Sequence, residues 1–337
     1  MLTFLFATIQ RDSAISFPLL GDWTINPPSY FTVFGRPIYF YGILIALGFM
    51  IAILFCARLA PKFGIPTDSF YDLTLWLIPL SILGARLYFV VFNLEYYIHH
   101  PREIIAVWEG GLAIYGGLIV GTVTAYLFCR AKKLSFPAML DVISFGVLFG
   151  QALGRWGNFF NREAFGAETD IFCRMGLTTP EGSTIYVHPT FLYESLWNLV
   201  GLLLLILFYK RGKRRYNGQC ILLYFFWYGL GRAWIEGLRT DSLYLGSTGI
   251  RVSQLLSVLI MLGAGFLLWR NRNRHDVLPS LSASANTDAA GNPECTDTQI
   301  SDKTVSEQAA PKPGSDYLQS DDSDTEGSEE MLSKQEE

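Results

Sequence analysis

The sequence predicts an all-α polytopic membrane protein with seven transmembrane helices, and three observations support this fold class. Half of the residues are hydrophobic and only 17% are charged, whereas an ordinary globular chain carries about 25% charged residues. Seven apolar stretches approach the roughly 20 residues that a helix needs to cross a bilayer. The formal charge of −4 also divides unevenly, because residues 276–337 hold 15 Asp/Glu and only 3 Lys/Arg. These figures argue against a soluble two-domain enzyme.

The chain divides into an outer N-terminal segment (1–36), a membrane domain (37–270) and an acidic cytoplasmic tail (271–337). The seven expected spans cover residues 37–57, 73–92, 111–129, 139–160, 189–209, 218–238 and 250–269. The first nine residues are apolar but follow no positively charged leader, so we do not predict a signal peptide. The tail is rich in Ser, Thr, Asp and Glu, and we expect it to be disordered because it has little apolar surface to bury.

The loops between the spans indicate how the chain is oriented. Cytoplasmic loops collect Lys and Arg, and every second loop of this chain is enriched in them. With the residues after the last span, these loops hold thirteen Lys/Arg, whereas the alternate loops and the N-terminus hold seven and the spans three. We therefore expect the N-terminus outside and the C-terminus in the cytoplasm.

Ionisable residues inside the spans are functional candidates, because a charge in the bilayer costs a few kcal/mol. Arg86, Arg155 and Arg232 all fall in the outer halves of their spans. Other polar residues expected near this level are Tyr41, Tyr115 and Glu194, together with Glu236 and Arg239, which follow Arg232 at spacings of four and seven. Three guanidinium groups near one level favour an anionic ligand, and the planar fork of Arg suits phosphate.

Each of these features also has a simpler interpretation. A single Arg near a helix end can extend its side chain to the headgroups. The glycines Gly146, Gly150 and Gly154 are better explained by close helix packing than by function. The adjacent His99 and His100 are interpreted as a solvated loop, and the five cysteines show no paired spacing, so we expect neither a metal site nor a cofactor.

A thirteen-residue segment at the outer end of the fourth span carries the most specific signal. It reads Gly154-Arg155-Trp156-Gly157-Asn158-Phe159-Phe160-Asn161-Arg162-Glu163-Ala164-Phe165-Gly166. This resembles the signature G-R-x-G-N-F-x-N-x-E-x-x-G of bacterial prolipoprotein diacylglyceryl transferases. Further similar motifs are Tyr39-Phe40-Tyr41-Gly42, Gly84-Ala85-Arg86, Trp108-Glu109-Gly110-Gly111-Leu112, His188-Pro189-Thr190-Phe191-Leu192-Tyr193-Glu194, and Tyr228-Gly229-Leu230-Gly231-Arg232 with Glu236 and Arg239.

The resemblance implies a transferase of the bacterial inner membrane, with its active site towards the outer leaflet. Its lipid substrate would be phosphatidylglycerol, and its acceptor the lipobox cysteine of a preprolipoprotein signal peptide, with no nucleic-acid partner. The products would be a thioether-linked lipid and glycerol phosphate. By match to the family, Arg155 and Arg232 would engage the phosphate. The expected substrate-binding residues are Arg155, Asn158, Glu163, Tyr41, Arg86, Tyr228, Glu236, Arg239 and His188.

One position departs from the family pattern and affects the choice of base. The family commonly has H-G-G-L after the W-[DE]-G-G element, whereas this chain has Tyr115-Gly116-Gly117-Leu118. An unperturbed tyrosine titrates near pH 10 and is a poor base unless nearby cations lower its pKa. We predict that Tyr115 stands near the incoming thiol, and His188 is the rival base, or else a helix-entry residue.

Two other classes of membrane protein are compatible with seven spans. A retinal protein is excluded because no Lys lies inside a predicted span. A transporter or flippase for an anionic phospholipid remains the alternative, although polar groups near one level favour surface chemistry over a midplane transport site.

Overall fold

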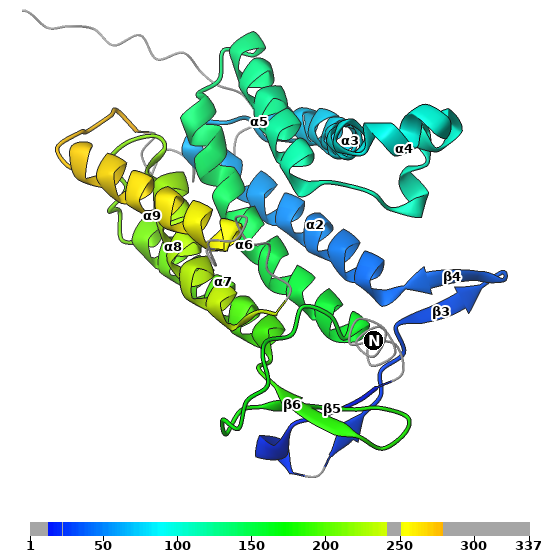
Figure 1. Ribbon diagram of the computed structural model, residues 1–337. Coiled ribbons are helices and arrows are strands. Elements are labelled where there is room, and N and C mark those ends of the chain that lie inside the picture. The colour runs from blue at the N-terminus through cyan, green and yellow to red at the C-terminus, as the bar shows by residue number, and fades with distance from the viewer. Residues whose placement is uncertain (1–12, 22, 241–250, 279–337) are drawn as a thin grey trace, which may run out of the picture. The chain divides into compact units, whose positions relative to one another are not determined.

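The computed structural model describes residues 13–21, 23–240 and 251–278, which all lie in one compact unit of residues 1–291 (Figure 1). The long helices are α2 (Phe40–Leu59), α3 (Thr67–Phe92), α5 (Ile114–Ala131), α6 (Phe136–Asn161), α7 (Thr190–Lys210), α8 (Gln219–Ile235) and α9 (Val252–Arg270). The shorter helical elements are α4 (Leu94–His99) and the 3-10 turns Pro18–Leu20, Ala60–Phe63, Pro101–Ile105, Val107–Glu109 and Glu236–Leu238. The expected disorder of the tail concerns residues that lie mostly outside the described part of the chain.

Among the described residues, six helices are long and apolar enough to cross a membrane, which agrees with the predicted polytopic membrane protein. The six are Phe40–Phe63, Thr67–Phe92, Ile114–Ala131, Phe136–Asn161, Thr190–Lys210 and Val252–Arg270. The remaining predicted span, 218–238, corresponds to α8, which has only 17 residues. It is shorter than predicted because the chain leaves α-helical geometry at Glu236 and forms a 3-10 turn.

Glycines and tryptophans determine how the helices pack. Helix α6 packs along α2, α7 and α8, while α3 pairs with α5 and α8 with α9 (Figure 1). The backbones of α3 and α5 meet where a Cβ atom at Gly116 would clash with the carbonyl oxygen of Gly84. Between α7 and α8, the indoles of Trp197 and Trp227 stack with centroids 4.2 Å apart, and each donates a hydrogen bond to the other's backbone carbonyl. These contacts fix the register in which α7 and α8 present their polar residues.

A buried carboxylate fastens the start of α8 to α6. Asp141 is fully buried and accepts hydrogen bonds from the backbone N–H groups of Gly218 (2.8 Å) and Ile221 (2.9 Å). It also pairs with Arg214 at 3.3 Å. Because the first N–H groups of a helix lack partners within the helix, Asp141 caps α8 from a neighbouring helix. These Asp141 contacts lie at the opposite end of α8 from Arg232.

Two small antiparallel sheets, which the sequence analysis did not predict, stand beside the helices (Figure 1). The first has the order β2-β1-β5-β6, formed by β1 (Ala14–Ser16), β2 (Thr24–Ile25), β5 (Met175–Thr178) and β6 (Thr184–Val187). The second is the hairpin of β3 (Tyr30–Val33) and β4 (Arg36–Tyr39), which leads directly into α2. In the first sheet, Ile15 pairs with Leu177, and both side chains are fully buried. The N-terminal segment is therefore held against the loop between α6 and α7.

Candidate functional site

Glu194, near the start of α7, is the centre of an ion-pair cluster that joins three helical segments. One carboxylate oxygen lies 2.6 Å from Arg155 Nη2 of α6. The other lies 2.9 Å from Arg232 Nη1 of α8 and 3.2 Å from Arg239 Nη1. Arg232 also pairs with Glu236 at 2.9 Å. The Glu194 side chain is only 8% exposed, so the carboxylate at the centre of this set, which we call the Glu194 cluster, is held away from solvent.

Arg239 joins the Glu194 cluster from an extended segment after α8, and not from the helix itself. Spacings of four and seven residues would place Arg232, Glu236 and Arg239 on one face of a continuous helix, but α8 ends at Ile235 and the backbone of Arg239 is extended. A β-bridge between Gly166 and Arg239 holds this extended segment. A Cβ at Gly166 would come within 2.8 Å of the carbonyl oxygen of Leu238. The last glycine of the signature segment therefore lets the chain after α8 approach closely.

The signature residues form a hydrogen-bonded chain that begins at the cluster. Arg155 Nη1 donates to Asn158 Oδ1 at 3.4 Å, and Asn158 Nδ2 donates to Glu163 Oε1 at 2.8 Å. Asn161 Nδ2 also donates to Glu163 Oε1 at 3.3 Å. Helix α6 ends here because Arg162 adopts left-handed geometry (φ 51°), and this turn brings Glu163 back towards Asn158. The structure thus brings together Arg155, Asn158 and Glu163, as the sequence predicted.

Tyr41 lies against this segment because Gly157 has no side chain. A Cβ at Gly157 would clash with the Tyr41 ring, so the ring packs directly on the backbone of α6. Tyr41 also interacts electrostatically with Glu163 and Arg155. The second glycine of the signature therefore places Tyr41 at the site.

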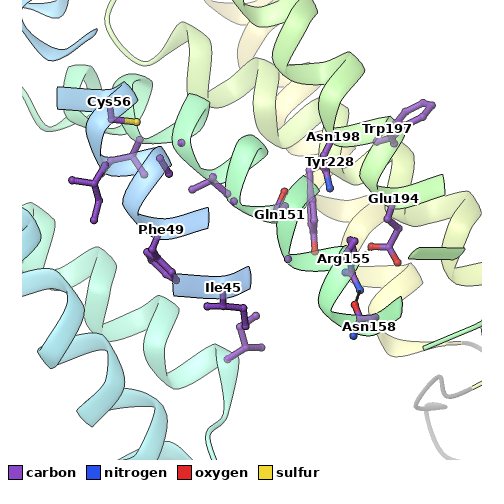
Figure 2. A pocket seen from close by; sticks show the side chains of 18 of the residues that line it. Ile45, Phe49, Cys56, Gln151, Arg155, Asn158, Glu194, Trp197, Asn198 and Tyr228 are labelled. Atoms are coloured by element: carbon purple, nitrogen blue, oxygen red, sulfur yellow. Dashed lines mark hydrogen bonds and ion pairs between the residues drawn. The ribbon is translucent and has the colours of Figure 1, made fainter. Parts of the chain in front are cut away.

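A cavity of about 600 Å³ opens beside the Glu194 cluster (Figure 2). Its polar wall contains Tyr41, Gln151, Arg155, Asn158, Glu194, Asn198, Tyr228 and Arg232. Its other walls are mainly apolar and come from α2, α3 and α6, as Figure 2 shows for Ile45, Phe49 and Cys56. A cavity with a few convergent polar groups and an otherwise apolar lining is typical of a small-molecule or lipid site.

The glycines of α6 have different roles, although the sequence favoured packing for all of them. A Cβ at Gly146 would lie 2.6 Å from the Cys56 sulfur, as expected at a helix contact. At Gly150 and Gly154 a Cβ would meet nothing within 4 Å. Both of these glycines line the cavity, where the lack of a side chain leaves space open. Gly150 also lies at a helix contact, because a Cβ at Gly48 of α2 would come within 3.8 Å of its Cα.

Arg86 is not part of the Glu194 cluster, contrary to its expected place beside the phosphate. It is 6% exposed, and its guanidinium packs over the Tyr97 ring. Its donors bind the backbone carbonyls of Glu103, Ile104, Gly110 and Gly111. Gly110 and Gly111 both have positive φ (92° and 64°), which glycine adopts without steric cost. The paired glycines therefore allow this loop to wrap around Arg86, and the arginine has a structural role.

We predict that Arg86→Leu loosens the loop of residues 103–111 and leaves the Glu194 cluster in place. Several carbonyls would lose a charged donor, and hydrogen bonds to charged groups contribute about 1.5–3 kcal/mol each. Amide hydrogen exchange should accelerate in residues 103–112, while exchange in residues 155–166 stays at the wild-type rate. Faster exchange around Arg155 would instead connect Arg86 to the Glu194 cluster.

The two candidate bases lie outside the cavity lining that the described residues form. Tyr115 is in the first turn of α5 and is exposed, and only its neighbour Ile114 lines the cavity. It does interact electrostatically with Tyr228 of the cavity wall. His188 precedes α7, with Nδ1 3.5 Å from the Tyr193 hydroxyl. Partial burial lowers the pKa of His188 below its ordinary value of 6.5.

Sequence reasoning did not include some residues that hold the site together. Glu194 was named as a polar residue near the expected level but was not among the expected substrate-binding residues, although a carboxylate inside a span was a sufficient signal. Beside it, Trp156 donates to the Ser195 hydroxyl (3.2 Å), which donates to the carbonyl of Ala152 (2.9 Å). Arg162 is buried and donates to the carbonyls of Ser13 and Pro27. No sequence pattern indicated these partners.

A search of the described residues for metal ligands found no group of three or more His, Cys, Asp or Glu side chains that could hold a metal ion. The polar wall of the cavity is dominated by guanidinium, amide and hydroxyl groups. These groups bind anions and hydrogen-bond acceptors, and the chemistry they can supply is that of charge stabilisation.

Comparisons with known proteins agree with the motifs and the geometry. Residues 28–270 match the family model described as prolipoprotein diacylglyceryl transferase. The phosphatidylglycerol–prolipoprotein diacylglyceryl transferase of Limosilactobacillus reuteri is 44% identical over 245 residues, which cover 71% of this chain and 88% of the relative. The proteins of the same name from Halalkalibacterium halodurans and Pediococcus pentosaceus are each 42% identical, covering 70% and 75% of this chain and 83% and 93% of the relatives. The chain therefore belongs to the prolipoprotein diacylglyceryl transferase family.

Proposed function

We propose that the protein transfers the sn-1,2-diacylglyceryl group of phosphatidylglycerol to the lipobox cysteine of a preprolipoprotein. The names of its relatives give the lipid and the class of acceptor. One structural observation indicates which residues would bind the lipid phosphate. Of the three arginines around Glu194, Arg155 and Arg232 line the cavity, and their side chains are 26% and 17% exposed. A phosphate in the cavity would therefore meet these two guanidinium groups.

The reaction forms one bond and breaks one. The cysteine sulfur attacks the glyceryl carbon that carries the phosphate ester, forming the thioether. The carbon–oxygen bond to phosphate breaks, and its electron pair leaves with glycerol phosphate. The thiol proton goes to a base, because a thiol with an ordinary pKa near 8.5 is mostly protonated at neutral pH.

Negative charge on the departing phosphate grows during this reaction, and Arg155 and Arg232 would stabilise it. Aligned donors in a site that excludes water contribute most when they are already in place. Glu194 holds Arg155 and Arg232 in position before the lipid binds, because its carboxylate pairs with both guanidinium groups. Asn158 and Glu163 support Arg155 from the other side. The apolar part of the cavity would accommodate the acyl chains.

The proposed topology has seven spans, with α8 as the sixth. The ends of α6 and α8 and the start of α7 carry the Glu194 cluster. The opposite ends of these helices lead into loops rich in Lys and Arg, such as residues 210–215. By the positive-inside rule those loops are cytoplasmic, so the cluster faces the outer leaflet of the bacterial inner membrane and the C-terminal tail lies in the cytoplasm.

Reconstitution tests the proposed function directly. The purified full chain is placed in phosphatidylglycerol vesicles with a lipobox peptide, and the peptide is analysed by mass spectrometry. We expect a diacylglyceryl thioether on the cysteine and equimolar glycerol phosphate, and neither product from a peptide with Ser in place of Cys. A folded protein that makes no thioether but moves labelled lipid between leaflets would overturn the proposal in favour of a transporter.

We further predict that Tyr115→Phe lowers kcat by about 100-fold, which is at the lower end of the range for loss of a general base. His188→Ala is expected to lower kcat by less than about 10-fold. The pH profile provides a second measurement. If His188 is the base, its neutral form acts, so activity rises as the pH increases through a pKa below 6.5. His188→Ala would then remove that acid limb. Full activity in both variants would exclude both residues as the base.

A further inference from the structure

A second set of polar residues lies one helical turn deeper in the cavity than the Glu194 cluster. Its members are Gln151, four residues before Arg155; Asn198, four residues after Glu194; and Tyr228, four residues before Arg232. All three line the cavity. Helices α6 and α8 run towards the cluster and α7 runs away from it, so each residue is displaced towards the middle of its helix. Four residues correspond to about 6 Å along a helix axis.

Two of these side chains line the cavity with hydrogen-bond donors that no other described residue accepts. Asn198 is only 7% exposed, and within the described residues its amide makes no hydrogen bond. The hydroxyl of Tyr228 likewise has no hydrogen-bond partner there. Gln151 differs, because its Nε2 donates to the Tyr224 hydroxyl at 3.0 Å, and its only unpartnered atom among the described residues is the buried acceptor Oε1. Figure 2 shows Asn198 and Tyr228 among the residues that line the cavity, and Tyr228 interacts electrostatically with Arg155 and Glu194.

Such donors point to a ligand with acceptor groups at this depth. Buried polar groups in proteins almost always have partners, and a donor without one is costly where water is absent. An acyl chain offers no acceptor. In a diacyl phospholipid, the two ester carbonyls lie next to the phosphate on the side of the acyl chains. If Arg155 and Arg232 hold the phosphate, the two ester carbonyls lie about one helical turn deeper in the cavity, near Asn198 and Tyr228.

We propose that Asn198 and Tyr228 donate hydrogen bonds to the two ester carbonyl oxygens of the lipid substrate, so that the site selects ester-linked over ether-linked lipid. This inference rests on the proposed function, because it takes a glycerophospholipid as the ligand. It assigns specificity to Asn198, which no sequence motif singled out. Gln151 acts as a positioning residue through Tyr224, whose ring stacks on Tyr228 with centroids 5.9 Å apart.

Paired lipids test the inference. The full chain is assayed with a lipobox peptide and phosphatidylglycerol in two forms, diacyl and dialkyl, with equal chain lengths. The dialkyl lipid keeps the phosphate and the reacting carbon but lacks both carbonyls. We expect the wild-type protein to show a kcat/KM about 10-fold higher for the diacyl lipid, the size expected for two hydrogen bonds of ordinary net strength.

Asn198→Leu should reduce the diacyl/dialkyl ratio to about 3 or less, since one donor of the pair is gone. Tyr228→Phe removes only a hydroxyl and gives the same readout if the first variant does not fold. Asn93→Leu is the matched control, because Asn93 lies at the end of α3, outside the cavity, and it should keep the wild-type ratio. A general loss of stability would lower both rates together and leave the ratio unchanged.

Each outcome separates the two proposals. Equal wild-type rates for the two lipids, or a ratio unchanged in both variants, would overturn ester recognition and leave the transferase proposal intact. A variant defect that is equal for both lipids but relieved by more peptide would show that Asn198 binds the peptide, which also overturns the inference. If the wild-type protein makes no thioether from either lipid, the proposed function fails and ester recognition fails with it.

Discussion

Replacing Arg232 by alanine is expected to lower kcat for thioether formation by about 10²–10³-fold, the usual effect of removing one preorganised donor to a developing charge. Arg155→Ala should have an effect of similar size, because both guanidinium groups line the cavity. Lysine should rescue poorly in either position, since an ammonium group cannot form the bidentate contact with phosphate. Initial rates in phosphatidylglycerol vesicles, with protein folding checked by thermal unfolding, measure these effects.

Arg58→Ala is the matched control for both substitutions. Arg58 is exposed near the end of α2, and its described hydrogen bond goes to the carbonyl of Leu54 in its own helix. It should retain the wild-type kcat. If Arg155→Ala and Arg232→Ala both retain more than half of the wild-type kcat while folded, the phosphate does not bind where we place it.

Removing the charge of Glu194 is expected to have the second large effect, on stability as well as on rate. Glu194→Gln leaves Arg155, Arg232 and Arg239 without the carboxylate that they share. Breaking a buried ion pair by removing one partner costs about 3–5 kcal/mol, so the midpoint of thermal unfolding should fall clearly. The rate should also fall, because the arginines lose their fixed positions.

An added anion provides a specific test of this explanation. Glycerol phosphate should raise the unfolding midpoint of Glu194→Gln more than that of the wild-type protein, since the anion replaces the missing carboxylate. Glu168→Gln, in an exposed part of the loop after α6, should behave like wild type with and without the anion. A Glu194→Gln protein with wild-type stability and rate would show that the cluster is not held together by this carboxylate.

Local sequence was sufficient to predict most of the helical architecture. Continuous apolar stretches placed six of the seven long helices within three residues, as for the last span, which was predicted at 250–269 and is observed as the helix Val252–Arg270. The exception is α3, which begins at Thr67, six residues before the predicted span. The signature segment also placed Arg155, Asn158 and Glu163 in one motif, and hydrogen bonds join their side chains in the structure. Residues close in sequence on one helix and its following turn meet because helix geometry brings them together, and no long-range contact is required.

Three features that local sequence did not predict depend on contacts between distant segments. Arg86 has the sequence context of an intramembrane anion ligand, but its partners are carbonyls of a loop some 20 residues later. Strand β1 pairs with β5 across more than 150 residues, and a three-residue strand has no periodicity of its own to reveal it. Arg239 joins the cluster through an extended segment held by Gly166.

The sequence by itself determined the membrane class, the approximate spans and the family, because hydropathy and motif spacing are local properties. Only the tertiary structure decided which charges meet. Glu194 binds Arg155 and Arg232 because the paired Trp197 and Trp227 set the register of α7 against α8. Asn198 lies on the same helix as Glu194 and lines the cavity, and no other described residue hydrogen-bonds to its amide. A charge inside the membrane acquires its role from the groups packed around it, and those groups come from helices far apart in the chain.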